Sequence, residues 1–155
     1  MKKIYLIITI LLYSCLSKND TSLSLNNLFQ DNMVMQHESV VPVWGLSKSN
    51  KEVKILSSWD EEITTISDSN GYWKVNINTP KADNISHKII ISSDNEKIII
   101  NDVLLGEVWL ASGQSNMEWR IRQTLNSDEI NELEENTNIR MITVDRNLSL
   151  KPLKT

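Results

Sequence analysis

The sequence predicts an antiparallel β-sandwich followed by the first part of an α/β domain. Short β-branched runs alternate with turn-rich segments over residues 28–100, and no helical pattern lies between them. Near Asp102 the pattern changes to an apolar run, a helical segment and a second apolar run. Strand, helix and strand in this order open a parallel sheet, and such a sheet needs further strands. We therefore expect one complete sandwich and an incomplete second domain.

The first residues have the pattern of an export signal. Met1-Lys2-Lys3 is basic, and the apolar run Ile4–Leu12 is too short to span a bilayer permanently. Leu12-Tyr13-Ser14-Cys15 resembles a relaxed bacterial lipoprotein cleavage box. We expect residues 1–15 to be a signal peptide that is cut before Cys15, and Cys15 to carry lipid. The alternative is an ordinary secretory signal. Either way the expected location is a bacterial cell envelope, in the periplasm or anchored to the membrane by Cys15.

Residues 16–27 are polar and rich in Ser and Asn, as is typical of a tether. The sandwich is expected over residues 28–102, where Asn70-Gly71 is the strongest hairpin signal. Strands at this regular short spacing favour an antiparallel sandwich. The expected strands are Val40–Trp44, Glu52–Leu56, Glu62–Ile66, Tyr72–Ile77, Lys88–Ile91 and Lys97–Ile100.

Two of these runs allow a finer prediction. In Tyr72–Ile77 the apolar residues Trp73, Val75 and Ile77 alternate with polar ones, which predicts one buried and one wetter face. Pro42 has no backbone N–H to give to a ladder, so its run is expected at an edge or at a strand start.

Residues 103–155 contain the candidate catalytic serine. The run Val108–Ala111 reads as a buried strand that breaks at Gly113, and Ser115 follows at the start of a helical region. A helix start offers unpaired N–H groups, which suit an oxyanion beside a nucleophilic hydroxyl. Asn126–Glu129 predicts the N-cap of a helix that ends near Asn136. Ile139–Val144 predicts a second buried strand.

Composition excludes several other classes of function. The net charge is −4 and the lysines are scattered, so no basic stripe suits nucleic acid. The sequence has no Cys/His cluster for zinc and no Gly-rich phosphate loop, so we expect neither a metal nor a cofactor. Met117 stands where a nucleophile elbow would need glycine. From spacing alone, a helix-cap serine competes with a nucleophile at Ser115.

The blocks Gly106–Leu110 and Gly113–Glu118 resemble the first block of the sialate O-acetylesterase family, which belongs to the SGNH (GDSL-like) hydrolases. The resemblance implies that residues 103–155 begin an SGNH esterase domain with a flavodoxin-like α/β fold. It runs in order from about Leu28 to the end of the chain. Further matching segments are Phe29–Gln36, Val41–Gly45, Asn70–Val75 and Ile139–Val144.

The resemblance also assigns roles. It implies that Ser115 is the nucleophile, with its own backbone N–H donating to the oxyanion, and that Gly113, Gln114 and Asn116 shape the turn. The family's oxyanion glycine, oxyanion asparagine and late Asp/His pair have no counterpart in these 155 residues. His37 and His87 do not match the catalytic histidine, and both are expected on surface loops.

The activity implied by the resemblance is removal of acetyl groups from sialic acids or related sugars, through an acetyl-Ser115 intermediate. The partner would be an acetylated glycan. Two alternatives stay open: a xylan acetylesterase with the same chemistry, and a non-catalytic β-sandwich module that binds sugar or only supports the fold. Because no base is present, we expect this chain alone to have essentially no esterase activity.

Overall fold

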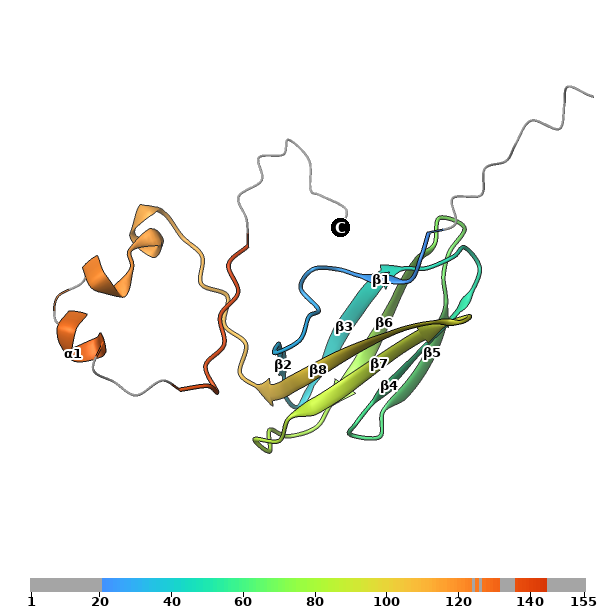
Figure 1. The fold of residues 1–155 in the computed structure, drawn as a ribbon, viewed down its shortest axis with the longest axis horizontal. Coiled ribbons are helices and arrows are strands. Elements are labelled where there is room, and N and C mark those ends of the chain that lie inside the picture. Colours follow the sequence, from blue (N-terminus) through green and yellow to red (C-terminus); the bar gives the residue numbers. More distant parts are fainter. Residues whose placement is uncertain (1–20, 124, 126, 132–135, 145–155) are drawn as a thin grey trace, which may run out of the picture.

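The computed structural model describes residues 21–123, 125, 127–131 and 136–144, and its regular structure is mainly strand (Figure 1). The predicted signal peptide and Cys15 lie outside these residues. None of the described helices is long and apolar enough to cross a membrane. The described strands are β1 (Ser24–Leu25), β2 (Val34–Gln36), β3 (Ser39–Leu46), β4 (Glu52–Ser57), β5 (Glu62–Ile66), β6 (Tyr72–Thr79), β7 (His87–Ser93) and β8 (Glu96–Gly106).

The strands form two sheets, and the prediction of a β-rich fold is confirmed. One sheet has the order β1-β3-β6 and the other β2-β8-β7-β4-β5. Each of the six predicted runs lies within an observed strand. The expectation of purely antiparallel pairing is wrong at one place, because β2 pairs with β8 in parallel. These two strands are far apart in the sequence and no hairpin joins them, so no short turn dictates their relative direction.

A single hydrophobic core receives side chains from both sheets. In β6 the predicted alternation is confirmed, since Trp73, Val75 and Ile77 are buried and the residues between them are exposed. The fully buried isoleucines of β4 and β7, Ile55, Ile89 and Ile91, extend this core from the other sheet. Burial of such side chains contributes about 1.5–3 kcal/mol each and is the main stabilising term of the fold.

The turn at Asn70-Gly71 forms, but it does not close a hairpin. Gly71 has a φ of +85°, and the Asp68 carboxylate accepts the backbone N–H groups of Asn70 and Tyr72. However, β5 pairs with β4 whereas β6 pairs with β3, so this turn carries the chain from one sheet to the other. The turn residues dictate a local reversal; they do not dictate which sheet the next strand joins.

Pro42 lies where β3 is unpaired on one side. Its partner in β6 is Asn76, while β1 pairs only with Gly45 and Leu46. The missing N–H of Pro42 therefore breaks no hydrogen bond to β1, which agrees with the predicted edge position.

Strand β8 extends from the core towards the segment that carries Ser115. It continues past the predicted range of 28–102 as far as Gly106, and β1 lies within the range predicted as a tether. Beyond β8 the regular structure of the described residues consists of three short helices: η1 (Ser115–Glu118), η2 (Ile121–Gln123) and α1 (Ser127–Asn131). The predicted helix start after Asn126 is confirmed by α1, and residues 132–135 lie outside the described part.

The prediction of two strands in the second domain is wrong. Residues 108–111 and 139–144 have no strand conformation. Their apolar side chains are exposed: Trp109 by 86%, Leu110 by 92% and Met141 by 93%. A strand is completed by hydrogen bonds to its neighbours. Within the described residues no further strand lies beside these two segments, so their apolar pattern alone does not make a sheet.

Two glycines in strands allow a matched test of packing. A Cβ at Gly45 would lie 2.1 Å from the Ser24 carbonyl oxygen and 2.9 Å from the Trp73 ring, whereas at Gly106 it would meet only Val34 at 3.5 Å. We expect Gly45→Ala to lower the free energy of unfolding by about 1–3 kcal/mol. Gly106→Ala should change it by less than about 1 kcal/mol.

Chemical denaturation followed by tryptophan fluorescence measures both values. Equal unfolding midpoints for the two variants would contradict the packing of β1 against β3.

Candidate active site

Ser115 lies at the start of a tight turn beyond the end of β8. It is the first residue of η1, and Gln114 before it is extended, with φ −92° and ψ −161°. The Met117 N–H donates to the Gln114 carbonyl at 2.9 Å, and the Trp119 N–H donates to the Asn116 carbonyl at 3.4 Å. The sequence thus placed the serine correctly at a helix start, but the helix is a single 3₁₀ turn.

The turn brings Gly113, Gln114, Ser115 and Asn116 together, and all four are exposed. At Gly113 an added Cβ would lie 2.6 Å from Cγ of Met117. The structure shows why glycine suits this position in the turn, because the Met117 side chain folds back over this residue. The absence of a Cβ therefore lets the turn close on itself.

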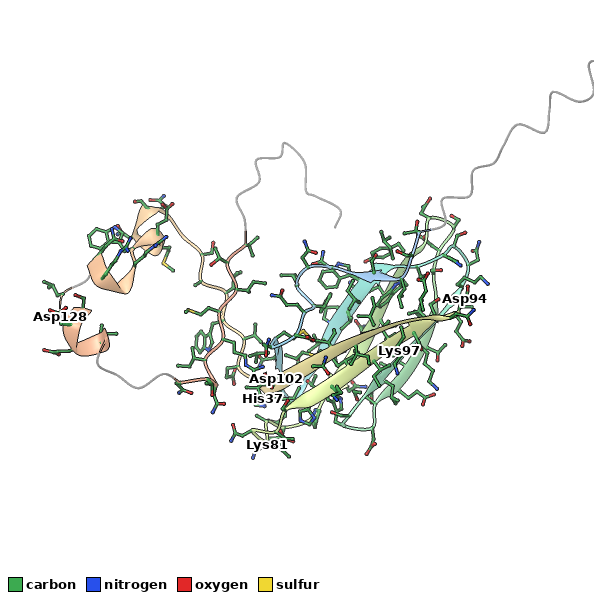
Figure 2. The ribbon with its side chains drawn as sticks, in the orientation of Figure 1. His37, Lys81, Asp94, Lys97, Asp102 and Asp128 are labelled. Carbon is green, nitrogen blue, oxygen red and sulfur yellow. The ribbon has the colours of Figure 1, made fainter. Side chains whose placement is uncertain are left out.

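His37 lies just after β2 and is partly exposed, with a side-chain exposure of 21%. Its Nε2 lies 3.1 Å from the Glu107 carboxylate, and its Nδ1 lies 3.3 Å from the Glu38 carboxylate. These contacts with acidic side chains place His37 at the end of β8, near the labelled Asp102 in Figure 2. His37 therefore helps to fix the point where the chain leaves the sheet.

The expectation of a surface-loop histidine at position 87 is wrong. His87 is the first residue of β7 and only 7% exposed. Its Nδ1 lies 3.0 Å from the Ser58 hydroxyl and its Nε2 lies 3.1 Å from the Asp83 carboxylate. The Ile85 backbone N–H and His87 hold the pKa of Asp83 below its usual range. The i, i+4 spacing of Asp83 and His87 was the available sequence signal.

The contacts among Ser58, His87 and Asp83 form a network that is part of the sheet. The Ser58 hydroxyl also accepts the Lys88 backbone N–H at 3.0 Å, and the Ser58 N–H donates to the Lys88 carbonyl. The Trp59 ring packs edge-on against His87 at 5.3 Å. The network ties the turn after β4 to the start of β7, and its bonds satisfy a buried imidazole.

The point where β8 ends is held by side-chain hydrogen bonds. The Gln36 side-chain amide donates to Glu107 at 3.1 Å, and its carbonyl oxygen accepts the Val108 backbone N–H at 2.9 Å. The hydrogen bond from Gln36, and then that from His37, hold the pKa of Glu107 below its usual range. Local sequence patterns do not reveal the contact between Gln36 and Glu107, because it joins positions 71 residues apart.

Other possible sites lie away from Ser115. A depression of about 840 Å³ lies over the three-stranded sheet and includes Trp44, Asp68, Asn70, Tyr72 and Lys74 in its lining. Within residues 21–123, 125, 127–131 and 136–144, no three His, Cys, Asp or Glu side chains are grouped so that they could hold a metal ion.

Comparison with known proteins identifies similar chains. No protein-family model matches the sequence. The sialate O-acetylesterases of Mus musculus and Rattus norvegicus are each 27% identical in an alignment of 122 residues, and each alignment covers 72% of this chain. Among solved structures, a carbohydrate acetylesterase from Xanthomonas citri matches 70% of this chain with a TM-score of 0.64 and 31% identity.

The matches cover only part of these relatives. The chain spans 23% of the mouse protein, 22% of the rat protein and 24% of the Xanthomonas citri structure, so about a quarter of each. Both comparisons nevertheless lead to acetylesterases, and the structural match includes most of this chain. These similarities support the assignment of this chain to an acetylesterase family.

Proposed function

We propose that this chain carries the nucleophile of a serine carbohydrate O-acetylesterase, and that the nucleophile is Ser115. The observation that carries the proposal is the exposed Ser115 at the start of the turn Gly113–Glu118, in a chain whose relatives are acetylesterases. In this reaction the Ser115 Oγ attacks the acetyl carbonyl and its proton passes to a general base. The bond to the sugar oxygen breaks, and that oxygen takes the proton from the base. The base then accepts a proton from water, whose oxygen attacks acetyl-Ser115, and acetate leaves as the Ser115 Oγ regains a proton.

The general base is proposed to come from outside the described residues. Within the described part, His37 contacts Glu38 and Glu107, and His87 contacts Ser58 and Asp83. Both imidazoles are thus engaged in contacts other than with Ser115. A late Asp/His pair, as in the family, would complete the site in a longer protein.

The exposed apolar segments support a continuing SGNH domain with a flavodoxin-like sheet. Trp109 and Leu110 on one segment, and Met141 and Ile142 on the other, present apolar side chains to solvent. Large exposed apolar patches mark surfaces that another part of a protein covers. We propose that residues 103–155 begin that domain, that 28–102 form the core of a two-sheet sandwich, and that parallel strands cover 108–111 and 139–144.

The proposed substrate is an acetylated sialic acid or a related acetylated sugar. The mouse and rat relatives are named for sialate, and the Xanthomonas citri relative for carbohydrate in general. A xylan acetylesterase uses the same chemistry on a different sugar. The two can be separated in the uninterrupted protein, by which we mean this chain together with the proposed rest of the catalytic domain. The measurement is the rate of acetate release from acetylated sialic acids and from acetylated xylo-oligosaccharides.

A sugar-binding module is the second candidate, and the depression over the three-stranded sheet favours it. Its lining combines the aromatic rings of Trp44 and Tyr72 with the polar side chains of Asp68, Asn70 and Lys74. Aromatic rings beside such polar groups are typical of small-molecule sites. Glycan binding without acetate release by the uninterrupted protein would favour this module.

The first prediction tests the nucleophile. In the uninterrupted protein, Ser115→Ala should lower kcat for an aryl acetate by at least about 1,000-fold, because no hydroxyl is left to attack. Ser69→Ala is the matched control, since Ser69 is also exposed and lies on a turn distant in sequence from Ser115. Acetate release by Ser115→Ala at the wild-type rate would remove Ser115 from the mechanism.

The second prediction concerns the 155-residue chain by itself. Without a general base the Ser115 hydroxyl stays protonated, so aryl acetate hydrolysis should stay at the background rate of buffer. Enzyme-like turnover that disappears in Ser115→Ala would show that a base is already present in this chain.

The third prediction concerns the envelope. We propose that the chain is cut before Cys15 and that Cys15 carries the lipid. Cys15→Ser should then move the protein from the membrane fraction to the soluble fraction of the expressing bacterium, because the acyl chains supply the anchor. Unchanged fractionation would favour an ordinary secretory signal.

A further inference from the structure

Arg140 ties the segment 136–144 back to the five-stranded sheet. Among the described residues 136–144, Arg140 alone is partly buried, with a side-chain exposure of 18%. Its Nη2 lies 2.9 Å from the Asp102 carboxylate, and its Nη1 donates to the backbone carbonyls of Asp102 and, at 3.3 Å, Met33. One guanidinium therefore joins the returning segment to β8 and to the residue before β2.

The backbone at Asp102 is shaped for this contact. The register between β7 and β8 shifts between His87 and Ile89, which marks a bulge, and Asp102 has a φ of +53°. A bulge redirects the side chains beside it, and aspartate tolerates the left-handed region better than most residues. The kink turns both the carboxylate and the carbonyl of Asp102 to the same guanidinium.

Neighbouring groups hold Asp102 in the charged form. The Ser86 hydroxyl, and then Arg140, keep the pKa of the Asp102 carboxyl below its usual range. The carboxylate is therefore ionised throughout the neutral pH range. A planar guanidinium that bonds a carboxylate and two carbonyls is fixed in direction as well as in place, which a lysine could not reproduce.

The segment that carries Ser115 is thus fastened at both ends to the same pair of strands. At its start, Gln36 beside β8 holds Glu107 and Val108. Where the segment comes back to the sheet, Arg140 bonds Asp102 and Met33. The parallel pairing sets Val34 opposite Leu104 and Gln36 opposite Gly106, so the two contacts flank one short ladder. Figure 1 shows the orange and red segments leaving and returning at this end of β8.

We propose that Arg140 and Asp102 are positioning residues that fix where Ser115 stands relative to the sheet. The proposal rests on Ser115 being the nucleophile. Ordinary exposed ion pairs contribute little to stability, so the expected role is geometric. A displacement of about 1 Å between reacting atoms lowers rate by up to about 100-fold.

The test uses the uninterrupted protein and Arg140→Gln. We expect kcat for an aryl acetate to fall about 10- to 100-fold while KM stays within about threefold, because the reacting atoms shift and the substrate contacts do not. The rate at which an aryl phosphonate labels Ser115 should fall by the same factor as kcat. Asp102→Asn should act in the same direction, and the double variant should match the larger single effect.

The control is Lys97→Gln, which removes one positive charge from an exposed position of the same strand, labelled in Figure 2. It should leave kcat and KM unchanged. Arg140→Lys keeps the charge opposite Asp102 but lacks the planar fork, so its kcat should lie between those of wild type and Arg140→Gln. If Arg140→Gln does not fold, Arg140→Lys tests the proposal in its place.

Three outcomes distinguish the possible failures. If Ser115→Ala is inactive but the Arg140 variants keep the wild-type kcat, positioning by Arg140 is wrong and the proposed nucleophile stands. If Ser115→Ala keeps its activity, the proposed nucleophile itself is wrong. If the kcat of each Arg140 variant follows only its folded fraction, measured by thermal unfolding, the contact is merely structural and the inference is overturned.

Discussion

The burial of two sheet faces against each other is the constraint on which the structure depends. Trp73 and Ile77 from the three-stranded sheet share one core with Ile55 and Ile91 from the five-stranded sheet. Each of these side chains lies on a strand whose alternate residues are less buried, so the core fixes which face of each of these strands points inwards. A shift of one residue in any strand would expose its apolar face. Register, sheet order and the position of β8 all follow from this burial.

Strand β8 transmits that order to the candidate site. Ile100, Val103 and Leu105 hold β8 in the core. The exposed residues just after the strand, Glu107 and Val108, are held by side-chain contacts with Gln36 and His37. The core thus sets the place and direction in which the chain leaves the sheet. The Ser115 turn itself has no buried residue, and the longer segment that carries it is fastened to the sheet at Val108 and at Arg140.

The buried polar groups show how the same frame restricts chemistry. His87 lies in the sheet, and its imidazole contacts Ser58 and Asp83. The Ser58 hydroxyl also accepts a hydrogen bond from the Lys88 backbone N–H, which holds this serine beside the start of β7. A serine, a histidine and an aspartate in contact do not by themselves make a hydrolytic site. The exposed serine of η1 has the opposite character, since it is accessible and lies outside the core.

The sequence by itself determined the six longer strands β3–β8, the alternation in β6, the turn residues at Asn70-Gly71 and the helix start at Ser115, because each depends on side chains within a few residues of one another. Tertiary structure decided what joins distant positions. It placed β5 and β6 in different sheets, made β2 parallel to β8, buried His87, and brought Arg140 to Asp102. The apolar runs at 108–111 and 139–144 show the same division. A local pattern gives a segment its capacity to pair, but hydrogen-bonding partners elsewhere in the chain determine whether a strand forms.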